Sequence, residues 1–238
     1  MTTSLVSGAY NFRDTGGLPA LGGTTRHGVL FRSGNLANVD AEGLVAMRGL
    51  RLRRIVDLRD EDEVVRSPSR GVDGLDTIRV PLFLGSVASF FERDMSLGEL
   101  YGAIIDDSAD RVVDVVRAVI GDQPVLVHCT VGKDRTGVTV ALSLLAAGVD
   151  PDAVVADYAR TETLLPASRN DAVITRIREV YPGATRIEEL ATKSPAPVMR
   201  ALIDRVEKVF GSPADYLRAH GMSDDEIVEL RRVLVGNR

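Results

Sequence analysis

Short apolar runs alternate with longer amphipathic segments over the first 150 residues. The runs predict strands over residues 29–31, 54–58, 77–82 and 125–127. Residues 77–82 alternate polar and apolar side chains, as a half-buried strand does. The run Val125-Leu126-Val127 is apolar throughout, which is typical of a strand buried on both faces.

Helical spacing of apolar residues marks the segments between and after these strands. It predicts helices over residues 111–120, 136–147, 198–210 and 227–234. The helix over 136–147 is apolar nearly all round, which indicates a buried position, and Gly148 suits its C-terminal cap. Asp150 followed by Pro151 is typical of an N-cap with proline at the first helical position.

The alternation of strands and helices predicts an α/β fold, with a mainly parallel central sheet flanked by helices. Beyond Asp150 the pattern is helical only. We find no repeat and no convincing linker in the chain. We therefore expect a single domain over residues 1–238, in which residues 1–150 form the α/β core and a helical C-terminal portion, residues 151–238, packs on it.

The composition restricts which binding partners and which cellular location are expected. The chain carries 29 basic and 34 acidic residues, a formal net charge of −5, which argues against general nucleic-acid binding. Screening beyond about 8 Å still allows a local basic pocket to hold a phosphate. The N-terminus lacks the features of a secretory signal, and the longest apolar stretch is too short to span a bilayer. We expect a cytoplasmic protein without membrane insertion; export by a signal-free route and the oligomeric state stay open.

Cys129 is the only cysteine of the sequence. One cysteine cannot form an internal disulfide or a cysteine-cluster zinc site. The three histidines lie far apart and show no ligand spacing. The sequence therefore implies no metal and no organic cofactor.

The segment with the clearest chemistry runs from Val127 to Gly137 and reads VHCTVGKDRTG. It joins the predicted buried strand to the predicted buried helix. Such a junction directs backbone N–H groups and the positive helix end into one concavity, which suits a tetrahedral dianion. Gly132 permits φ > 0 and close approach of the ligand. The residues expected to bind the substrate are Thr130, Val131, Gly132, Lys133, Thr136 and Gly137.

Cys129 at the start of this segment is the candidate nucleophile. Only a few per cent of a free cysteine is thiolate at neutral pH. Loop amides, the helix end, Lys133 and Arg135 all favour the thiolate, and the helix end alone supplies at most about 2 kcal/mol. Arg135, six positions later, offers a planar fork for two phosphoryl oxygens. A buried structural thiol is the alternative interpretation of Cys129.

A leaving group needs a proton, and Asp134 is the nearest candidate acid. Its neighbours Lys133 and Arg135 favour its ionised form, whereas the charge of a bound phosphate favours the protonated form. The rival acids from elsewhere in the chain are Asp57, Asp60, Asp106 and Asp107.

Three further residues are candidates for a supporting role. We interpret His128 as a hydrogen-bonding residue that holds the loop. Asp57 and Arg59 follow a predicted strand. They form either a scaffold ion pair or, at the carboxyl end of that strand, a border of the pocket.

The spacing from Cys129 to Arg135 matches the C-x5-R signature of protein tyrosine phosphatases. The longer string HCxxGKDRTG resembles the bacterial protein tyrosine phosphatase family that includes a secreted mycobacterial enzyme. Other segments resemble elements of that family in the same order: residues 11–14 with Gly16-Gly17, residues 31–33 with Leu36, residues 56–59 with Glu63, Asp157-Tyr158, and residues 215–217. The resemblance covers nearly the whole chain.

This resemblance implies a protein-tyrosine-phosphatase-like α/β fold and a phosphocysteine intermediate. It implies Cys129 as nucleophile, Arg135 as phosphate binder, Asp134 as in-loop acid and Thr136 as a hydroxyl that supports Cys129 in the second step. Lys133 beside the acid resembles loops that accept phosphoinositides. The mycobacterial enzyme has a helical lid, for which residues 161–194 are the candidate here.

The leading hypothesis is a phosphatase for phosphotyrosine, with phosphoserine, phosphothreonine or phosphoinositide as further substrates. Its partners are then phosphorylated proteins or phosphoinositides. The alternative is a pseudo-phosphatase that binds phosphorylated partners without cleaving them. A third hypothesis is another thiolate enzyme, such as a sulfur-transfer or arsenate-reducing one.

Overall fold

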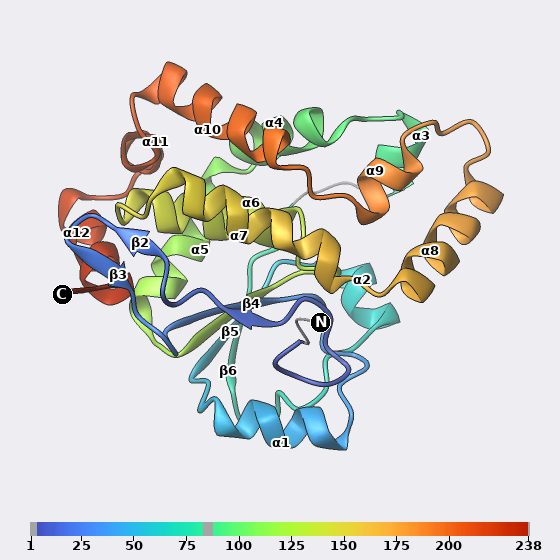
Figure 1. Cartoon of the computed structure of the whole chain (residues 1–238), viewed down its shortest axis with the longest axis horizontal. Helices are drawn as coiled ribbons and strands as arrows, with labels where there is room; N and C mark the ends of the chain where they lie inside the picture. Colours follow the sequence, from blue (N-terminus) through green and yellow to red (C-terminus); the bar gives the residue numbers. More distant parts are fainter. Residues whose placement is uncertain (1–3, 83–87, 238) are drawn as a thin grey trace.

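A five-stranded sheet lies at the centre of the computed structural model, which describes residues 4–82 and 88–237 (Figure 1). Its strands, in spatial order, are β1 (Arg13–Asp14), β4 (Leu30–Ser33), β7 (Val125–His128), β5 (Arg54–Asp57) and β6 (Asp76–Arg79). β4, β7, β5 and β6 run parallel to one another, and β1 is antiparallel to β4. This confirms the mainly parallel sheet predicted from the sequence.

The two faces of the sheet bury different side chains because successive residues of a strand point to opposite sides. Phe31, Leu126 and Ile55 lie side by side in register. They pack with Met47 of helix α1 (Ala41–Gly49), which lies on the opposite side of the sheet from α6 (Arg135–Ala146) and α7 (Pro151–Leu164) in Figure 1. On the other face, Leu30, Val56, Val125 and Val127 belong to a core cluster that also contains buried residues of α6, which packs on β4 and β7. A sheet buried on both faces explains the apolar strand sequences.

Further helices follow α1 along the described chain. They are α2 (Glu61–Arg66), α3 (Ala88–Glu92), α4 (Leu97–Asp107), α5 (Ala109–Gly121), α6 (Arg135–Ala146), α7 (Pro151–Leu164), α8 (Ala167–Val180), α9 (Ile187–Thr192), α10 (Ala196–Phe210), α11 (Pro213–Ala219) and α12 (Asp224–Leu234). α6 packs against α4, α5, α7, α11 and α12 as well as the sheet. Packing against helices and the sheet explains why the sequence of α6 is apolar nearly all round.

The predicted end of α6 and start of α7 are confirmed. Gly148, with φ of +89°, follows the end of α6. The Asp150 carboxylate then accepts a hydrogen bond from the Ala153 N–H at 3.0 Å, and Pro151 occupies the first turn of α7. These short-range signals depend only on neighbouring residues, which is why the sequence displays them.

The expectation that the chain beyond Asp150 is helical only is wrong at its end. A short strand, β8 (Val235–Asn237), pairs with β3 (Gly23–Thr25), which also pairs with β2 (Pro19–Ala20). A three-residue strand has too few positions to show a period, and its partner lies more than 200 residues earlier in the sequence. The pairing fastens the helical portion to the first residues of the α/β core.

Candidate active site

The segment between β7 and α6 forms a tight loop around the sulfur of Cys129. The Gly132 N–H donates to Cys129 Sγ at 3.3 Å, and Cys129 is only 3% exposed. Gly132 has φ of +73°, and a Cβ on it would lie 2.4 Å from the carbonyl carbon of Ser33. Only glycine fits this backbone position, because a side chain there is both strained and in collision.

Neighbouring strands and loops hold the carbonyl groups of this loop. The Gly132 carbonyl accepts from Asn11 Nδ2 at 2.8 Å and from Arg32 Nη2 at 2.9 Å. The Thr130 carbonyl accepts from the Asn35 N–H at 3.1 Å. In a planar trans peptide the C=O and N–H point in opposite directions. Carbonyls bound on the outside therefore turn the following N–H groups toward the concave side of the loop.

A buried ion network fixes the arginine that holds Gly132. Asp157 of α7 accepts from Arg13 Nε at 2.7 Å and from Arg32 Nη1 at 2.9 Å. Burial opposes ionisation of Asp157, but the charges of the two arginines lower its pKa. The carboxylate is therefore ionised and anchors β1 and β4 to α7, directly behind the loop.

Arg135 is held flat by Glu63, a residue of α2. Its Nη1 and Nη2 donate to the two Glu63 carboxylate oxygens at 2.6 and 2.7 Å, and Nη1 also donates to the Leu58 carbonyl at 3.3 Å. The Thr130 hydroxyl donates to the same carboxylate. Burial favours neutral Glu63, but the hydrogen bonds and charge of Arg135 lower its pKa to about 2. The pair presents a fixed, charged guanidinium beside Cys129.

Glu63 has no predicted role in the sequence beyond its place in the family resemblance. A signal was present, because Asp60 and Glu63 have the spacing of a capping box. The Glu63 N–H donates to Asp60 at 2.7 Å, and the Asp60 N–H donates back to Glu63 at 3.1 Å. The Glu63 carboxylate thus stabilises the first turn of α2 and also orients Arg135.

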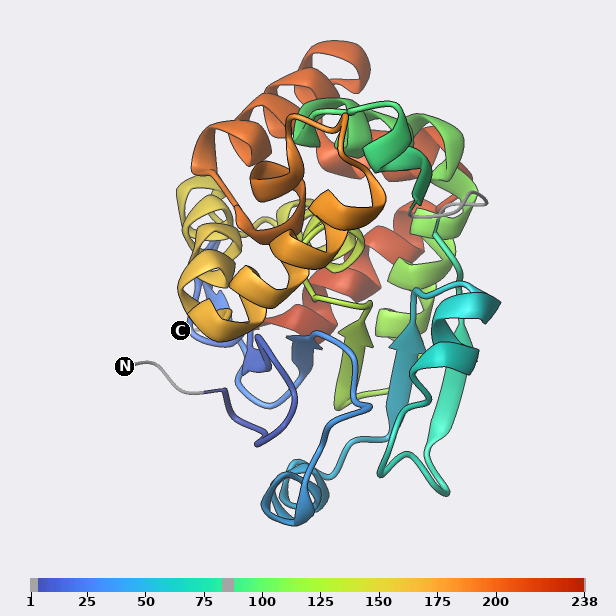
Figure 2. The same ribbon diagram turned by 90° about the vertical axis from the view of Figure 1, so that its right-hand side faces the viewer.

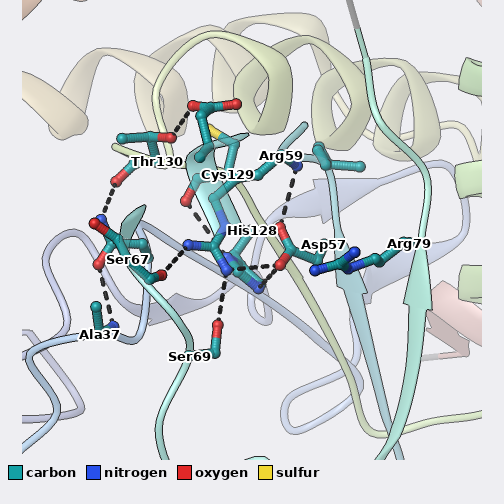
Figure 3. A network of polar contacts seen from close by, with 12 residues as sticks. Ala37, Asp57, Arg59, Ser67, Ser69, Arg79, His128, Cys129 and Thr130 are labelled. Carbon is teal, nitrogen blue, oxygen red and sulfur yellow. Dashed lines mark hydrogen bonds and ion pairs between the residues drawn. The ribbon is translucent and has the colours of Figure 1, made fainter. Parts of the chain in front are cut away.

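His128 and Asp57 lie beneath the loop (Figure 3). His128 is fully buried, and burial lowers its pKa, whereas the charge of Asp57 raises it. Its Nδ1 lies 3.4 Å from the Cys129 carbonyl oxygen, and its Nε2 lies 3.6 Å from Asp57 Oδ2. These positions support the interpretation of His128 as a residue that holds the loop.

The scaffold ion pair is the role that the geometry favours for Asp57 and Arg59. Arg59 donates to both Asp57 oxygens, at 2.9 and 2.7 Å, and further to the Ser67 carbonyl and the Ser69 hydroxyl (Figure 3). Burial opposes ionisation of Asp57, but His128 and Arg59 lower its pKa. Its two oxygens are occupied, so Asp57 is a poor candidate for the acid.

The Asp134 carboxylate faces the pocket that contains Cys129. Its Oδ1 accepts from Lys133 Nζ at 2.6 Å and from the Tyr101 hydroxyl at 3.0 Å. The Lys133 side chain is fully buried against this carboxylate and does not line the pocket. Of the rival acids, Asp60 caps α2, and Asp106 pairs with Arg205 at 2.6 Å.

The pocket over the loop has a volume of about 250 Å³. Its polar floor comes from the loop and Glu63. Its walls come from α3, α4, α8 and α9 and include the apolar residues Phe90, Phe91, Leu100, Val173, Ile177 and Leu190. Figure 2 shows α8 and α9, in orange, above the arrowheads of the central strands. The segment named as a candidate lid therefore supplies part of the wall, and an apolar wall of this kind suits an aryl group.

The remaining loop residues take different positions. Val131 and Thr130 line the pocket. The Thr136 hydroxyl is fully buried and has no hydrogen-bond partner within the described residues. A Cβ on Gly137 would lie 3.1 Å from the Tyr158 ring, so this glycine allows α6 and α7 to pack closely.

Residues 4–82 and 88–237 contain no cluster of three His, Cys, Asp or Glu side chains arranged to bind a metal ion. Over the same residues, every helix is too short or too polar to cross a membrane.

A cysteine at the end of a parallel strand, a loop amide that donates to its sulfur and an arginine at the start of the next helix together define a cysteine-dependent phosphatase. Comparison with known proteins identifies the family. Residues 5–236 match the tyrosine phosphatase family, and the chain belongs to it.

Two relatives match over most of their length. The chain is 30% identical to the triple specificity protein phosphatase PtpB of Mycobacterium tuberculosis, over 99% of this chain and 100% of the relative. It is 29% identical to a tyrosine-protein phosphatase of Nostoc commune, over 83% of this chain and 70% of the relative. Among solved structures, the catalytic domain of the yeast PP-IP phosphatase SIW14 matches with a TM-score of 0.40 and 14% identity, over 86% and 97% of the two chains.

Gly132→Ala should disrupt the loop. Left-handed backbone costs a non-glycine residue about 1–2 kcal/mol, and the collision with Ser33 costs about 1–3 more. We expect the free energy of unfolding to fall by more than about 2 kcal/mol, with loss of aryl phosphate turnover. Gly183→Ala, where an added Cβ would meet nothing within 4 Å beyond the adjoining residues, is the control and should change stability by less than about 0.5 kcal/mol. Equal effects of the two substitutions in denaturant titrations would contradict this account.

Glu63→Gln should destabilise the protein in a pH-dependent way. The pKa of Glu63 is about 2 in the folded protein against an ordinary value of 4.5. Its ionised form therefore stabilises the fold above pH 4.5, and this contribution is lost as the pH falls toward 2. We expect a deficit of about 2–3 kcal/mol at pH 7 relative to the wild type. The deficit should shrink below pH 4.5.

The matched control is Glu61→Gln in the same helix. Glu61 is 72% exposed and pairs with Arg79 at the surface, so we expect a change below about 0.5 kcal/mol at any pH. Denaturant titrations of the three proteins between pH 7 and pH 3 test the prediction. A Glu63→Gln deficit that is constant over this range would refute it.

Proposed function

We propose that this protein hydrolyses phosphotyrosine monoesters through a phosphocysteine intermediate. The observation that carries the proposal is one pocket that contains the Cys129 sulfur, the Arg135 guanidinium and the Asp134 carboxylate. The sulfur is the nucleophile, the guanidinium and loop amides bind the phosphoryl oxygens, and the carboxyl group serves the leaving oxygen.

In the first step, the thiolate of Cys129 attacks phosphorus. The S–P bond forms, the P–O bond to tyrosine breaks, and the departing oxygen takes the proton of Asp134. Negative charge that develops on the phosphoryl oxygens is stabilised by Arg135 and the loop N–H groups. Glu63 keeps the guanidinium in place, so little reorganisation is needed during the reaction.

In the second step, Asp134 accepts a proton from a water molecule that attacks phosphorus. The S–P bond breaks, and inorganic phosphate and the thiolate are released. The Thr136 hydroxyl, buried and without a partner in the described structure, is available to donate to the returning thiolate. This supports the role that the resemblance implies for Thr136.

The pocket walls favour an aryl ester over an alkyl ester. Phe90, Phe91 and Leu100 are among the side chains above the sulfur, and burial of an aromatic ring against them is favourable. The relative from M. tuberculosis is named a triple specificity phosphatase, which supports phosphoserine, phosphothreonine and phosphoinositide as further substrates. Comparing phosphotyrosine peptide, phosphothreonine peptide and phosphoinositide with one preparation measures this range. The cytoplasmic location stays a prediction.

The two alternative hypotheses, a pseudo-phosphatase and another thiolate enzyme, have less support. A pseudo-phosphatase has no need of Cys129, Asp134 and Arg135 together in one pocket. Family membership favours a phosphatase over a sulfur-transfer or arsenate-reducing enzyme.

Cys129→Ser should abolish turnover and preserve anion binding, because the amides and Arg135 remain while the serine hydroxyl is far less ionised than a thiol. We expect phosphate release from p-nitrophenyl phosphate to fall by more than about 10⁴-fold. Binding of tungstate, followed by calorimetry, should persist and shows that the pocket is intact. Turnover by this variant at more than a few per cent of the wild-type rate would rule out the proposed mechanism.

Asp134→Asn should slow esters with poor leaving groups most, because nitrophenolate departs without a proton. We expect a decrease in kcat of about 10²-fold for phenyl phosphate and of less than about 10-fold for p-nitrophenyl phosphate. Asp106→Asn, which changes a rival acid paired with Arg205, is the control and should leave both rates unchanged. Equal slowing of both esters by Asp134→Asn would assign the acid role to another residue.

A further inference from the structure

Two buried tyrosines form a hydrogen-bonded chain that ends on Asp134. The Tyr101 hydroxyl of α4 lies 3.0 Å from Asp134 Oδ1, and the Tyr158 hydroxyl of α7 lies 2.6 Å from that of Tyr101. The side chains are 1% and 0% exposed, and their rings meet edge to face, with centroids 6.0 Å apart. The sequence pattern does not connect these tyrosines with the loop, because they belong to two different helices.

The direction of the two hydrogen bonds follows from the number of protons. A tyrosine hydroxyl carries one proton, and a carboxylate oxygen only accepts. Tyr101 therefore donates to Asp134, and Tyr158 donates to Tyr101. Burial raises the pKa of both tyrosines, so both hydroxyls stay protonated near neutral pH.

The two oxygens of Asp134 have different surroundings. Tyr101 and Lys133 both donate to Oδ1. Oδ2 accepts no hydrogen bond from the described residues, while the side chain lines the pocket that contains Cys129 and Arg135. An oxygen with two donors is a poor place for a proton, so a proton on this carboxyl group resides on Oδ2.

We propose that Tyr101, itself held by Tyr158, is a positioning residue for the acid: it fixes Asp134 through Oδ1 and leaves Oδ2 as the oxygen that passes the proton to the leaving group. This inference rests on the proposed function, in which Asp134 is the acid. Lys133 alone is a weaker restraint, because one ammonium donor leaves the carboxylate free to rotate about its Cβ–Cγ bond. A second donor, which comes from helix α4, removes that freedom.

The test is the dependence of kcat on the leaving group. Tyr101→Phe removes the donor and keeps the ring, so we expect kcat to fall by about 10-fold for phenyl phosphate and by at most about twofold for p-nitrophenyl phosphate. Tyr158→Phe, one bond further from Asp134, should show the same selectivity at about threefold. In an Asp134→Asn background, Tyr101→Phe should have no further effect on the ratio of the two rates, because the group it positions is absent.

The matched control is Tyr216→Phe. Tyr216 is equally buried and donates to the Ile105 carbonyl of the same helix α4 at 2.9 Å, but it is outside the pocket. Tyr216→Phe should lower stability as the other tyrosine substitutions do. It should leave the ratio of the rates for phenyl phosphate and p-nitrophenyl phosphate unchanged. If Tyr101→Phe does not fold, Tyr158→Phe provides the same comparison.

Two results would overturn the proposal. One is equal slowing of both esters by Tyr101→Phe, which indicates a packing role only. The other is an undiminished effect of Tyr101→Phe on the ratio in the Asp134→Asn background. Failure of the proposed function is a separate result, since it appears as turnover by the Cys129→Ser variant, whatever the tyrosine variants do.

Discussion

The active site depends on one arrangement of the backbone. The Gly132 N–H donates to the Cys129 sulfur, and carbonyls bound on the outside of the loop turn the following N–H groups toward the same concave side. Converging donors repel one another and are favourable only around an anion. The protein maintains this arrangement by binding the carbonyls on the other side of the same peptides, through Asn11, Arg32 and Asn35. Arg32 is in turn fixed by the buried Asp157. The loop is thus the inner end of a hydrogen-bond network that extends from β4 to α7.

The same constraint accounts for the pairing of charges near the sulfur. Arg135 is paired with Glu63, Lys133 with Asp134, and Arg59 with Asp57. Each buried cation has a carboxylate partner, without which its burial would be costly. The pocket floor is therefore close to neutral in these pairs, and the preference for an anion comes from the loop amides and the end of α6. Fixed dipoles of this kind need no reorganisation when the substrate binds.

The parts of this site that could be predicted from the sequence are those encoded within one short segment. Cys129, Gly132 and Arg135 occur within seven residues, between a strand and a helix that the sequence pattern predicts. Their spatial arrangement therefore follows from local geometry alone. Glu63, Asn11 and Tyr101 reach the loop from elements whose positions are determined by packing, and no local pattern connects them with it. The same reason explains why one strand could be predicted and another could not. The apolar run of β7 indicates a strand by itself, whereas β8 forms only because β3 lies beside it.

The floor and the wall of the pocket are held by interactions of different strength. The floor depends on buried ion pairs and on the sheet. The helix α8, which supplies Val173 and Ile177 to the wall, has no buried residue of its own, and its flanks are attached through polar contacts such as those of Asp94 with the Thr185 and Arg186 N–H groups, at 2.7 and 2.9 Å. Segments with few buried apolar contacts separate from a fold at lower free energy than its core does. Variation of the wall can therefore change which ester reaches the sulfur while the loop, and with it the chemistry, stays the same.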